Sequence, residues 1–304
     1  MTPVFLPEHI LVILAGIVAG TFTRLGLLRV DYRQYPGYPH AYLAHLFLGF
    51  IASALGSVAV PAILKPDYAA VTFLALAAQQ FREIRTMERR TLESLEKTEL
   101  VKRGLDYIEG IARTFEARNY LVMGTAFATS LGAAFGGLFW AAVVAAGCFA
   151  VSYRFMSGEV IGDICDVVPA TISFERSILK VDEVGVMNIG LKDMRQIIMK
   201  DALAVKIIPK GPNAKATIHD MGQRSAMAFT ASVIVGVRKD IDIPEFTPLV
   251  RKNPDTGAVV LFIVPVEKDM EQLVAAVRLT PVLESARSKP LKSGPGLRAA
   301  QKRR

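Results

Sequence analysis

The chain has 304 residues, of which 52% are hydrophobic and 21% are charged. A mean hydropathy of +0.35 is high for a soluble protein, whereas the charged fraction is ordinary. The composition therefore indicates a lipid-facing part joined to a water-facing part. The two cysteines, Cys148 and Cys165, are too few for a disulfide framework or a cysteine-based metal site.

The first apolar segment begins close to the N-terminus. Residues 1–8 have no positively charged region and no A-x-A site follows them, which argues against a cleaved signal peptide. Residues 9–23 predict a transmembrane helix that extends to Leu28, with Arg24 snorkelling to the membrane interface. Gly16 and Gly20 form a G-x-x-x-G pair, which allows the close approach of another helix.

Residues 41–64 form a second apolar segment, which has no formal charge and is long enough to span a bilayer. His45 lies inside this segment. We interpret it as a histidine that hydrogen-bonds to a neighbouring helix, and a role in proton relay is the alternative. Residues 68–81 are apolar but short, so they either cross the membrane, re-enter it or lie in its interface.

The longest segment without Lys, Arg, Asp or Glu covers residues 119–153. As a single helix it would be about 52 Å long, well beyond a hydrocarbon core of about 30 Å. The glycines at positions 132, 136 and 137 offer a turn, so we predict a helical hairpin with arms at 120–135 and 138–153. A re-entrant loop and a buried core hairpin are the alternatives.

Basic residues set the predicted topology. Arginines follow the first apolar segment, at positions 24, 29 and 33, and the third, at positions 82, 85, 89 and 90. Because Lys and Arg concentrate in cytoplasmic loops, both loops lie inside only if residues 68–81 cross the membrane. The prediction is a cell-membrane protein with about five spans, an N-terminus outside and a cytoplasmic C-terminus.

A polar helical insert at residues 82–118 interrupts the predicted membrane region 1–156, with Gly104 as its break. It contains acid-to-base pairs in the favourable order, such as Glu99 and Arg103. Within it, Tyr107, Glu109 and Gly110 belong to the hexapeptide YIEGIA.

Three further blocks accompany this hexapeptide: DYRQYP at 31–36, ALAAQQF at 75–81 and FEARNY at 115–120. In these four blocks the chain resembles the YIEGIA family of membrane proteins from endospore-forming Firmicutes. The resemblance implies a multi-pass membrane protein tied to sporulation. It implies no particular reaction and no set of catalytic residues.

Residues 157–284 predict a small cytoplasmic α+β domain, in which 157–169 link the last span to the fold. Residues 170–189 are rich in β-branched residues and have a candidate turn at Asp182-Glu183. The spacing predicts helices at 191–202, 217–235 and 268–279, strands at Leu203–Pro209 and 258–266, and a loop at 239–257 with a turn at 253–255. A fragment covering 170–286 is expected to fold alone.

Residues 285–304 predict a basic disordered tail. After Glu284 the chain has seven Lys or Arg residues and no acid, and these contribute to the net charge of +8. Beside membrane helices, anionic lipid headgroups are the simpler partner for such a tail. Nucleic acid is not expected to bind.

Three carboxylates are candidate catalytic groups. Asp163 and Asp166 follow the last apolar arm, and they would share one face if this segment is helical. Paired carboxylates in a low dielectric can share a proton and activate water, as in aspartic proteases. Asp220 is a further candidate partner for either. The alternative is a polar linker at Asp163 and Asp166, and a favourable charge at a helix N-terminus for Asp220.

Other chemistries have weaker signals. Residues 210–215 resemble a phosphate-binding loop only loosely, because G-x-x-x-x-G-K-[ST] is absent. The four histidines are too scattered to predict a metal site, and no cofactor is expected.

Three functions remain open from the sequence. The preferred one is an integral membrane protein of endospore formation that regulates or recruits a protein partner through its cytoplasmic domain. The second is a membrane-bound aspartyl-type protease acting on membrane or spore-assembly proteins. The third, a small transporter subunit, ranks last because the predicted spans lack paired charges along a path.

Overall fold

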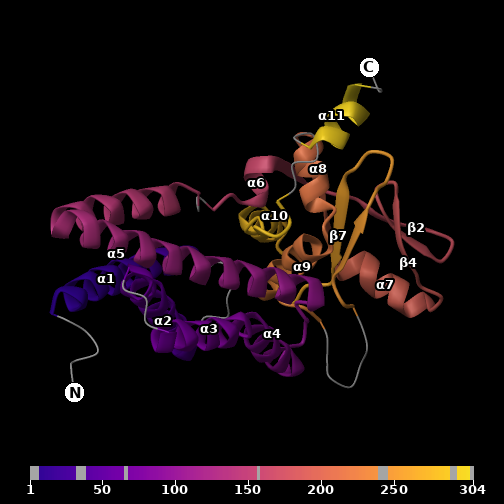
Figure 1. The fold of residues 1–304 in the computed structure, drawn as a ribbon. Coiled ribbons are helices and arrows are strands. Elements are labelled where there is room, and N and C mark those ends of the chain that lie inside the picture. The colour runs from indigo at the N-terminus through magenta and orange to yellow at the C-terminus, as the bar shows by residue number, and fades with distance from the viewer. Residues whose placement is uncertain are drawn as a thin grey trace. The chain divides into compact units, whose positions relative to one another are not determined.

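The computed structural model describes residues 7–31, 39–64, 68–155, 158–238, 246–287 and 293–301. The chain divides into two compact units: unit 1 comprises Met1–Arg90 with Ile111–Gly158, and unit 2 comprises Thr91–Gly110 with Glu159–Arg304. Figure 1 shows the helices of the first unit and the helices and strands of the second. Part of the predicted polar insert therefore belongs to the same unit as the C-terminal region.

Unit 1 is built from helices. They are α1 (Pro7–Asp31), α2 (Pro39–Leu64), α3 (Tyr68–Arg82), the first part of α4 (Ile84–Leu95) and the part of α5 (Leu105–Phe155) after Gly110. Three described segments are long and apolar enough to cross a membrane: His9–Leu28, Ala41–Leu64 and Leu105–Arg154. A helical, apolar N-terminal region is thus confirmed. The number of crossings, their orientation and a crossing by α3 stay predictions.

Small residues allow α1, α2 and α5 to pack closely. A Cβ atom added at Gly16 would overlap Ser57 of α2 and Ser130 of α5, and one added at Gly20 would overlap Ser53 of α2. The Ser53 and Ser57 hydroxyls donate hydrogen bonds to carbonyls one turn earlier in α2, so the contact leaves them satisfied. The predicted G-x-x-x-G pair therefore serves a helix contact within the chain.

The long helix α5 is a helical hairpin. Gly137 interrupts it with φ 71° and ψ −170°, a conformation open essentially to glycine alone. A Cβ atom added at Gly132 would lie 3.2 Å from a side-chain carbon of Val144, in the second arm, which a straight helix would not allow. Figure 1 shows the two arms of α5 side by side. The turn predicted within residues 132–137 is confirmed.

The polar insert breaks at the predicted glycine. A 3-10 turn, η1 (Glu96–Thr98), follows α4, and Gly104 adopts φ 84° immediately before α5 begins. Glu96 Oε1 accepts a hydrogen bond from the Gly104 amide at 3.0 Å. Arg103 Nη1 lies 3.3 Å from Glu99 Oε1, which confirms the predicted i,i+4 pair.

Unit 2 contains two antiparallel sheets, ordered β1-β5-β7-β6 and β2-β3-β4. The strands are β1 (Cys165–Pro169), β2 (Ile172–Glu175), β3 (Ile178–Val181), β4 (Val184–Asn188), β5 (Leu203–Pro209), β6 (Leu249–Lys252) and β7 (Val259–Ile263). The helices that follow Glu159 are α6 (Ile161–Ile164), α7 (Lys192–Asp201), α8 (Pro212–Ile218), α9 (Met221–Val235), α10 (Met270–Leu279) and α11 (Gly294–Gln301). The prediction of a mixed helix-and-strand region is confirmed.

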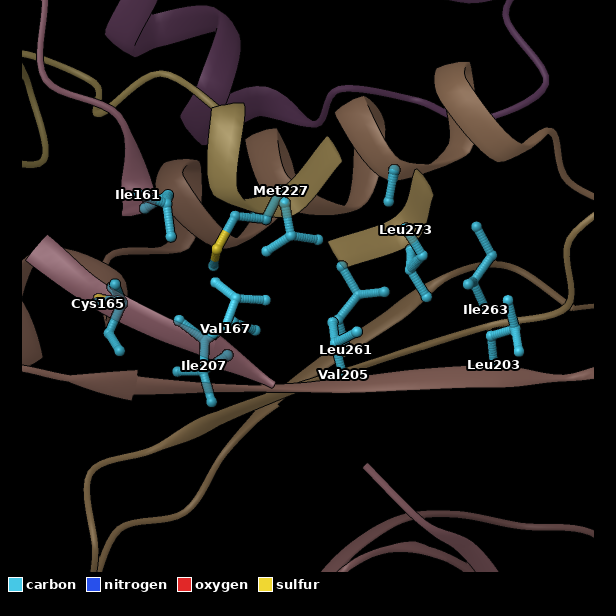
Figure 2. Close-up of a cluster of buried hydrophobic side chains, with 14 of the residues drawn as sticks. Ile161, Cys165, Val167, Leu203, Val205, Ile207, Met227, Leu261, Ile263 and Leu273 are labelled. Atoms are coloured by element: carbon cyan, nitrogen blue, oxygen red, sulfur yellow. The ribbon is translucent and has the colours of Figure 1, made fainter. Parts of the chain in front are cut away.

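The central strand β7 is buried along its whole length. Val259, Leu261 and Ile263 pack into a first core with β5, α9 and α10, and Figure 2 shows this cluster between the sheet and the helices that cover it. Val260 and Phe262 pack into a second core with β3, β4 and α7. Because side chains alternate along a strand, cover on both faces requires a continuous apolar sequence.

The segment interpreted as a linker at 157–169 forms regular structure from Ile161 onward. It forms α6 and the edge strand β1, which pairs with β5. Ile161, Cys165 and Val167 are buried in the first core, and Figure 2 labels all three among its side chains. A linker would not bury them, so the prediction was wrong at this position.

Three other predictions need correction. The strand β6 lies inside the predicted loop 239–257, whose prolines concealed it. The predicted helix 217–235 is two helices, because Asp220 caps a new one, α9. Helix α11 lies in the tail for which disorder was predicted.

The edge strand β1 leads to a test of domain boundaries. A fragment of residues 159–287 should unfold cooperatively in urea, and a fragment of residues 170–287 should be much less stable. The shorter fragment lacks three buried side chains, each contributing about 1.5–3 kcal/mol. Circular dichroism during urea unfolding measures the difference. Equal midpoints for the two fragments would show that β1 is not part of the stable fold.

Candidate functional site

The first two predicted carboxylates lie at the edge of the four-stranded sheet. Asp163 is in α6 and is exposed, and its Oδ2 accepts a hydrogen bond from the Val160 amide at 2.9 Å. Asp166 is on β1, also exposed, with Oδ1 3.6 Å from Lys210 Nζ. Since α6 ends at Ile164, the two aspartates do not share a helical face. Both side chains face water instead of a low-dielectric boundary.

The third predicted carboxylate, Asp220, caps α9. Its Oδ1 accepts a hydrogen bond from the Gln223 amide at 3.0 Å, the arrangement expected of an N-cap. Within the described part of the chain, no hydrogen bond or ion pair joins Asp220 to Asp163 or Asp166. A catalytic role for these three residues stays a prediction.

Cys165 directly precedes Asp166 in the chain. Its thiol is not reactive. Its side chain is buried in the first core. Burial raises the pKa of Cys165 to about 12, with the Lys210 charge opposing this rise and Asp166 adding to it. The thiolate that would act as a nucleophile is therefore not populated at neutral pH.

An apolar pocket of about 300 Å³ opens beside the second core of unit 2. It lies where the end of β4, the start of α7 and the approach to β6 meet. Its lining residues are Met187, Asn188, Ile189, Gly190, Leu191, Met194, Ile198, Phe246, Thr247 and Leu249. Ile189, Ile198, Phe246 and Leu249 also belong to the second core, so the pocket is an open edge of that core.

The pocket exposes large apolar side chains to solvent. Leu191 is 68% exposed and Met187 is 41% exposed. The sequence predicts a helix at 191–202. In the structure α7 begins at Lys192, after Leu191, and Ile198 is its one buried residue. A flexible, methionine-bearing apolar surface is typical of a site that adapts to a protein partner.

Two features hold the wall of this pocket in place. The Arg195 guanidinium donates hydrogen bonds to the Arg176 carbonyl at 2.7 Å and to the Gly190 carbonyl at 3.4 Å. It thereby ties the loop after β4 to the turn after β2. Phe246 adopts φ 48°, a left-handed conformation that a bulky residue rarely takes and that is found most often where a structure is functionally constrained.

The hexapeptide of the family resemblance has a packing role in unit 2. Tyr107 is buried, and its ring lies edge-on to Phe229 of α9 with centroids 6.5 Å apart. Arg103 Cζ lies 4.2 Å from the centroid of the same Phe229 ring, a cation–π contact. Gly110 is buried, and a Cβ atom added there would contact Ser285. Arg103 and the start of α5 are therefore fixed to α9 and to the turn after α10 by aromatic and glycine contacts.

Unit 1 holds a buried cluster of polar groups that the sequence did not reveal. His45 Nε2 lies 3.9 Å from Glu88 Oε1 of α4, and its ring centroid lies 4.5 Å from that of Phe115. Arg24 is fully buried, donates from Nε to the His45 carbonyl at 3.4 Å, and lies 5.4 Å from the Phe115 ring centroid. Arg24 therefore does not snorkel. The contact between His45 and Glu88 is too long for a hydrogen bond, so the hydrogen bond predicted for His45 stays a prediction.

This cluster weakens the reason given for ranking a transporter last, since Arg24 and Glu88 both lie against His45 in unit 1. The cavities beside it do not form a polar path, however. One of about 530 Å³ lies between α2, α3 and α4 and another of about 380 Å³ lies between α2, α3 and α5. Both are lined almost wholly by apolar side chains, including Leu55 and Leu74.

These features define a class of protein: apolar helices long enough to cross a membrane, joined to a mixed α/β unit. A family model described as YIEGIA protein matches residues 12–293, so the chain belongs to the YIEGIA family. It is similar to the uncharacterized protein YphB of Bacillus subtilis (strain 168), with 43% identity over 280 residues, 92% of this chain and 94% of the relative. No solved structure matches the chain.

The three aspartates lead to a test that separates capping from catalysis. Asp220→Ala should lower the free energy of unfolding by about 1 kcal/mol, whereas Asp220→Asn should not, because asparagine also caps helices. If Asp163, Asp166 or Asp220 is catalytic, its Asn variant should be present at a normal level and inactive in a sporulating host. Normal sporulation of all three Asn variants would eliminate the protease interpretation.

Arg24 packs along Gly49, which provides a second test. Gly49→Ala would place a methyl group on the Arg24 side chain, 2.9 Å from its Cβ. We expect a loss of stability of about 1–3 kcal/mol from this overpacking, seen as a lower thermal midpoint of the detergent-solubilised protein. Gly124→Ala is the matched control, since nothing lies within 4 Å of a Cβ at that helical glycine. Equal midpoints would contradict the packing of Arg24.

Proposed function

We propose that this protein is an integral membrane protein that holds a protein partner through its C-terminal α/β unit during endospore formation. The observation that carries the proposal is the apolar pocket beside α7. It combines exposed Leu191 and Met187 with a wall fixed by Arg195. Apolar anchors in a fixed frame suit the insertion of a partner's apolar side chains.

The membrane part of the proposal has separate support. Three apolar helical segments have the length that a bilayer requires. The arginine distribution favours an outside N-terminus and a cytoplasmic C-terminal unit, and the basic tail favours contact with anionic lipids. In this arrangement the helices anchor the unit, and the pocket recruits or regulates a cytoplasmic partner. The link to sporulation rests on membership of the YIEGIA family.

Site-specific crosslinking tests the pocket. A photoreactive amino acid at position 191 should form a discrete protein adduct in sporulating cells, and one at position 279 should not. Leu279 is a matched control, because it is 67% exposed and lies in the same unit on α10. Leu191→Asp should reduce sporulation at a normal protein level, because a charge opposes apolar docking, and Leu279→Asp should not.

The outcomes separate three explanations. A protein adduct at position 191 together with a defect for Leu191→Asp supports recruitment. A lipid adduct at that position would mean that the surface contacts the membrane. Normal sporulation of Leu191→Asp and of Met187→Glu, without an adduct, would refute the proposal.

A further inference from the structure

Three cations gather around His219 in unit 2. Lys215 is in α8, Arg224 is in α9 and Lys252 is the last residue of β6. Burial lowers the pKa of His219, the hydrogen bond with Gly257 opposes this, and each of the three cations lies close enough to lower the pKa further. Three elements that are separate in the sequence therefore present positive charge at one place.

These cations lack carboxylate partners. Among the residues that the structure describes, none of Lys215, Arg224 and Lys252 makes an ion pair. The Arg224 Nε atom is buried and makes no hydrogen bond to any of those residues. Other cations of unit 2 are paired. Examples are Lys206 with Glu183 at 2.9 Å, Arg238 with Asp201 at 2.6 Å and Arg287 with Glu159 at 2.7 Å.

His219 and Lys215 converge on the turn that follows β6. His219 Nε2 lies 2.9 Å from the Gly257 carbonyl oxygen. Because a carbonyl only accepts, Nε2 carries a hydrogen, and Nδ1 is the ring atom that gains a proton on ionisation. Lys215 crosses Gly257 so closely that an added Cβ atom would lie 2.8 Å from Lys215 Nζ. Gly257 has φ 78° and no side chain, so its carbonyl can accept from His219 while Lys215 packs against its Cα.

Two carboxylates belong to the same segments but do not neutralise the cluster. Asp220 follows His219, and its Oδ1 accepts the Gln223 amide as the cap of α9. Asp255 lies in the turn after β6 and is exposed. Its position is set by Asn253, whose Oδ1 accepts the Asp255 amide at 2.9 Å. Positive charge therefore exceeds negative charge around the imidazole.

We propose that Lys215, His219, Arg224 and Lys252 form a binding site for a phosphate group. Ammonium and guanidinium groups are the usual donors to phosphate oxygens, and their hydrogen bonds to an anion are about twice as strong as neutral ones. A bound anion would relieve the mutual repulsion of the cations, offer an acceptor to Arg224 Nε and favour protonation of His219 Nδ1. This site uses none of the residues that line the apolar pocket.

Residues 210–215, which loosely resemble a phosphate-binding loop, contribute only Lys215 to this site. Lys210 points elsewhere, since its Nζ donates to the Gly162 carbonyl at 3.1 Å. The site is thus built from side chains of α8, α9 and β6, without a loop of backbone amides around the anion. The phosphate group comes either from a small phosphorylated metabolite or from a phospholipid headgroup, and the chemistry at the site is the same.

Calorimetric titration with pyrophosphate tests the site, using the full chain in nanodiscs of phosphatidylcholine. Lys215→Gln, Arg224→Gln and Lys252→Gln should each weaken binding about tenfold or more, the effect of losing one charge-assisted hydrogen bond. Lys200→Gln is the matched control, since it removes the same charge from an exposed position in α7. Lys215→Arg should retain binding, because it keeps the charge. Unfolding midpoints of all variants check the fold.

The pH dependence of anion binding tests the role of His219 separately from the effect of general surface charge. Sulfate binding should strengthen from about pH 8 to about pH 5.5, because the anion favours the protonated His219 and sulfate itself keeps its charge over this range. In His219→Gln this dependence should disappear. Sulfate binding that varies equally with pH in both proteins would contradict the role of His219.

Nanodiscs with added phosphatidylglycerol distinguish the two sources of phosphate. If the headgroup occupies the site, they should weaken pyrophosphate binding in the unaltered protein, and the Gln variants should lose this competition. If the ligand is a soluble phosphate compound, the lipid should have no effect. Absence of pyrophosphate binding by the unaltered protein in phosphatidylcholine nanodiscs, or equal binding by Lys215→Gln and Lys200→Gln, would overturn the proposal.

Discussion

Burial of β7 on both faces is the constraint on which unit 2 depends. Its five residues, Val259–Ile263, are all buried, and neighbouring side chains point to opposite layers. One layer consists of α9 and α10 and the other of the β2-β3-β4 sheet with α7. A strand that is apolar on both faces is unstable without both layers, since each exposed face would leave large side chains in water. The apolar pocket arises where the second layer ends before it covers its core completely.

Unit 1 depends on a different constraint, the close approach of α1, α2 and the first arm of α5. Gly16 and Gly20 lie against Ser57 and Ser53, whose hydroxyls donate hydrogen bonds within α2. Gly16 also lies against Ser130 of α5, whose hydroxyl donates to the Val12 carbonyl of α1. Gly49 of α2 allows the same close approach of Arg24, because a side chain at position 49 would occupy the space of the aliphatic part of Arg24. Dense packing of this kind encloses a guanidinium only if it has partners, and the His45 carbonyl and the Phe115 ring provide them.

Local signals predicted the elements that depend on local physics. The glycines at 132–137 gave the hairpin turn, and Leu203–Pro209 gave β5 with its observed bounds. The predictions failed where tertiary contacts decide. The segment with β1 was interpreted as a linker because Asp163 and Asp166 made it polar. In β1, however, Cys165 and Val167 alternate with Asp166 and point into the core.

The candidate sites could not be predicted from the sequence, because tertiary contacts form them too. Leu191 and Ile198 fit one helical face in the sequence, and only the three-dimensional structure shows that one is exposed and the other buried. His45 has no charged neighbour within its own apolar segment, because Glu88 comes from α4. Lys215 and Lys252 stand far apart in the chain and meet at His219 only through the pairing of β6 with β7 and the turn between them.

The short strand β6 carries part of both proposed sites. Leu249 begins it and lines the apolar pocket, and Lys252 ends it and belongs to the cationic cluster. Their Cα atoms are about 10 Å apart at about 3.4 Å per residue. β6 pairs with β7 in a fixed register, Leu249 with Phe262 and Lys252 with Val259. Because β7 is held by two cores, neither end of β6 can shift without disturbing them. The spacing of the apolar pocket and the cationic cluster is therefore set by the same buried strand that stabilises the unit.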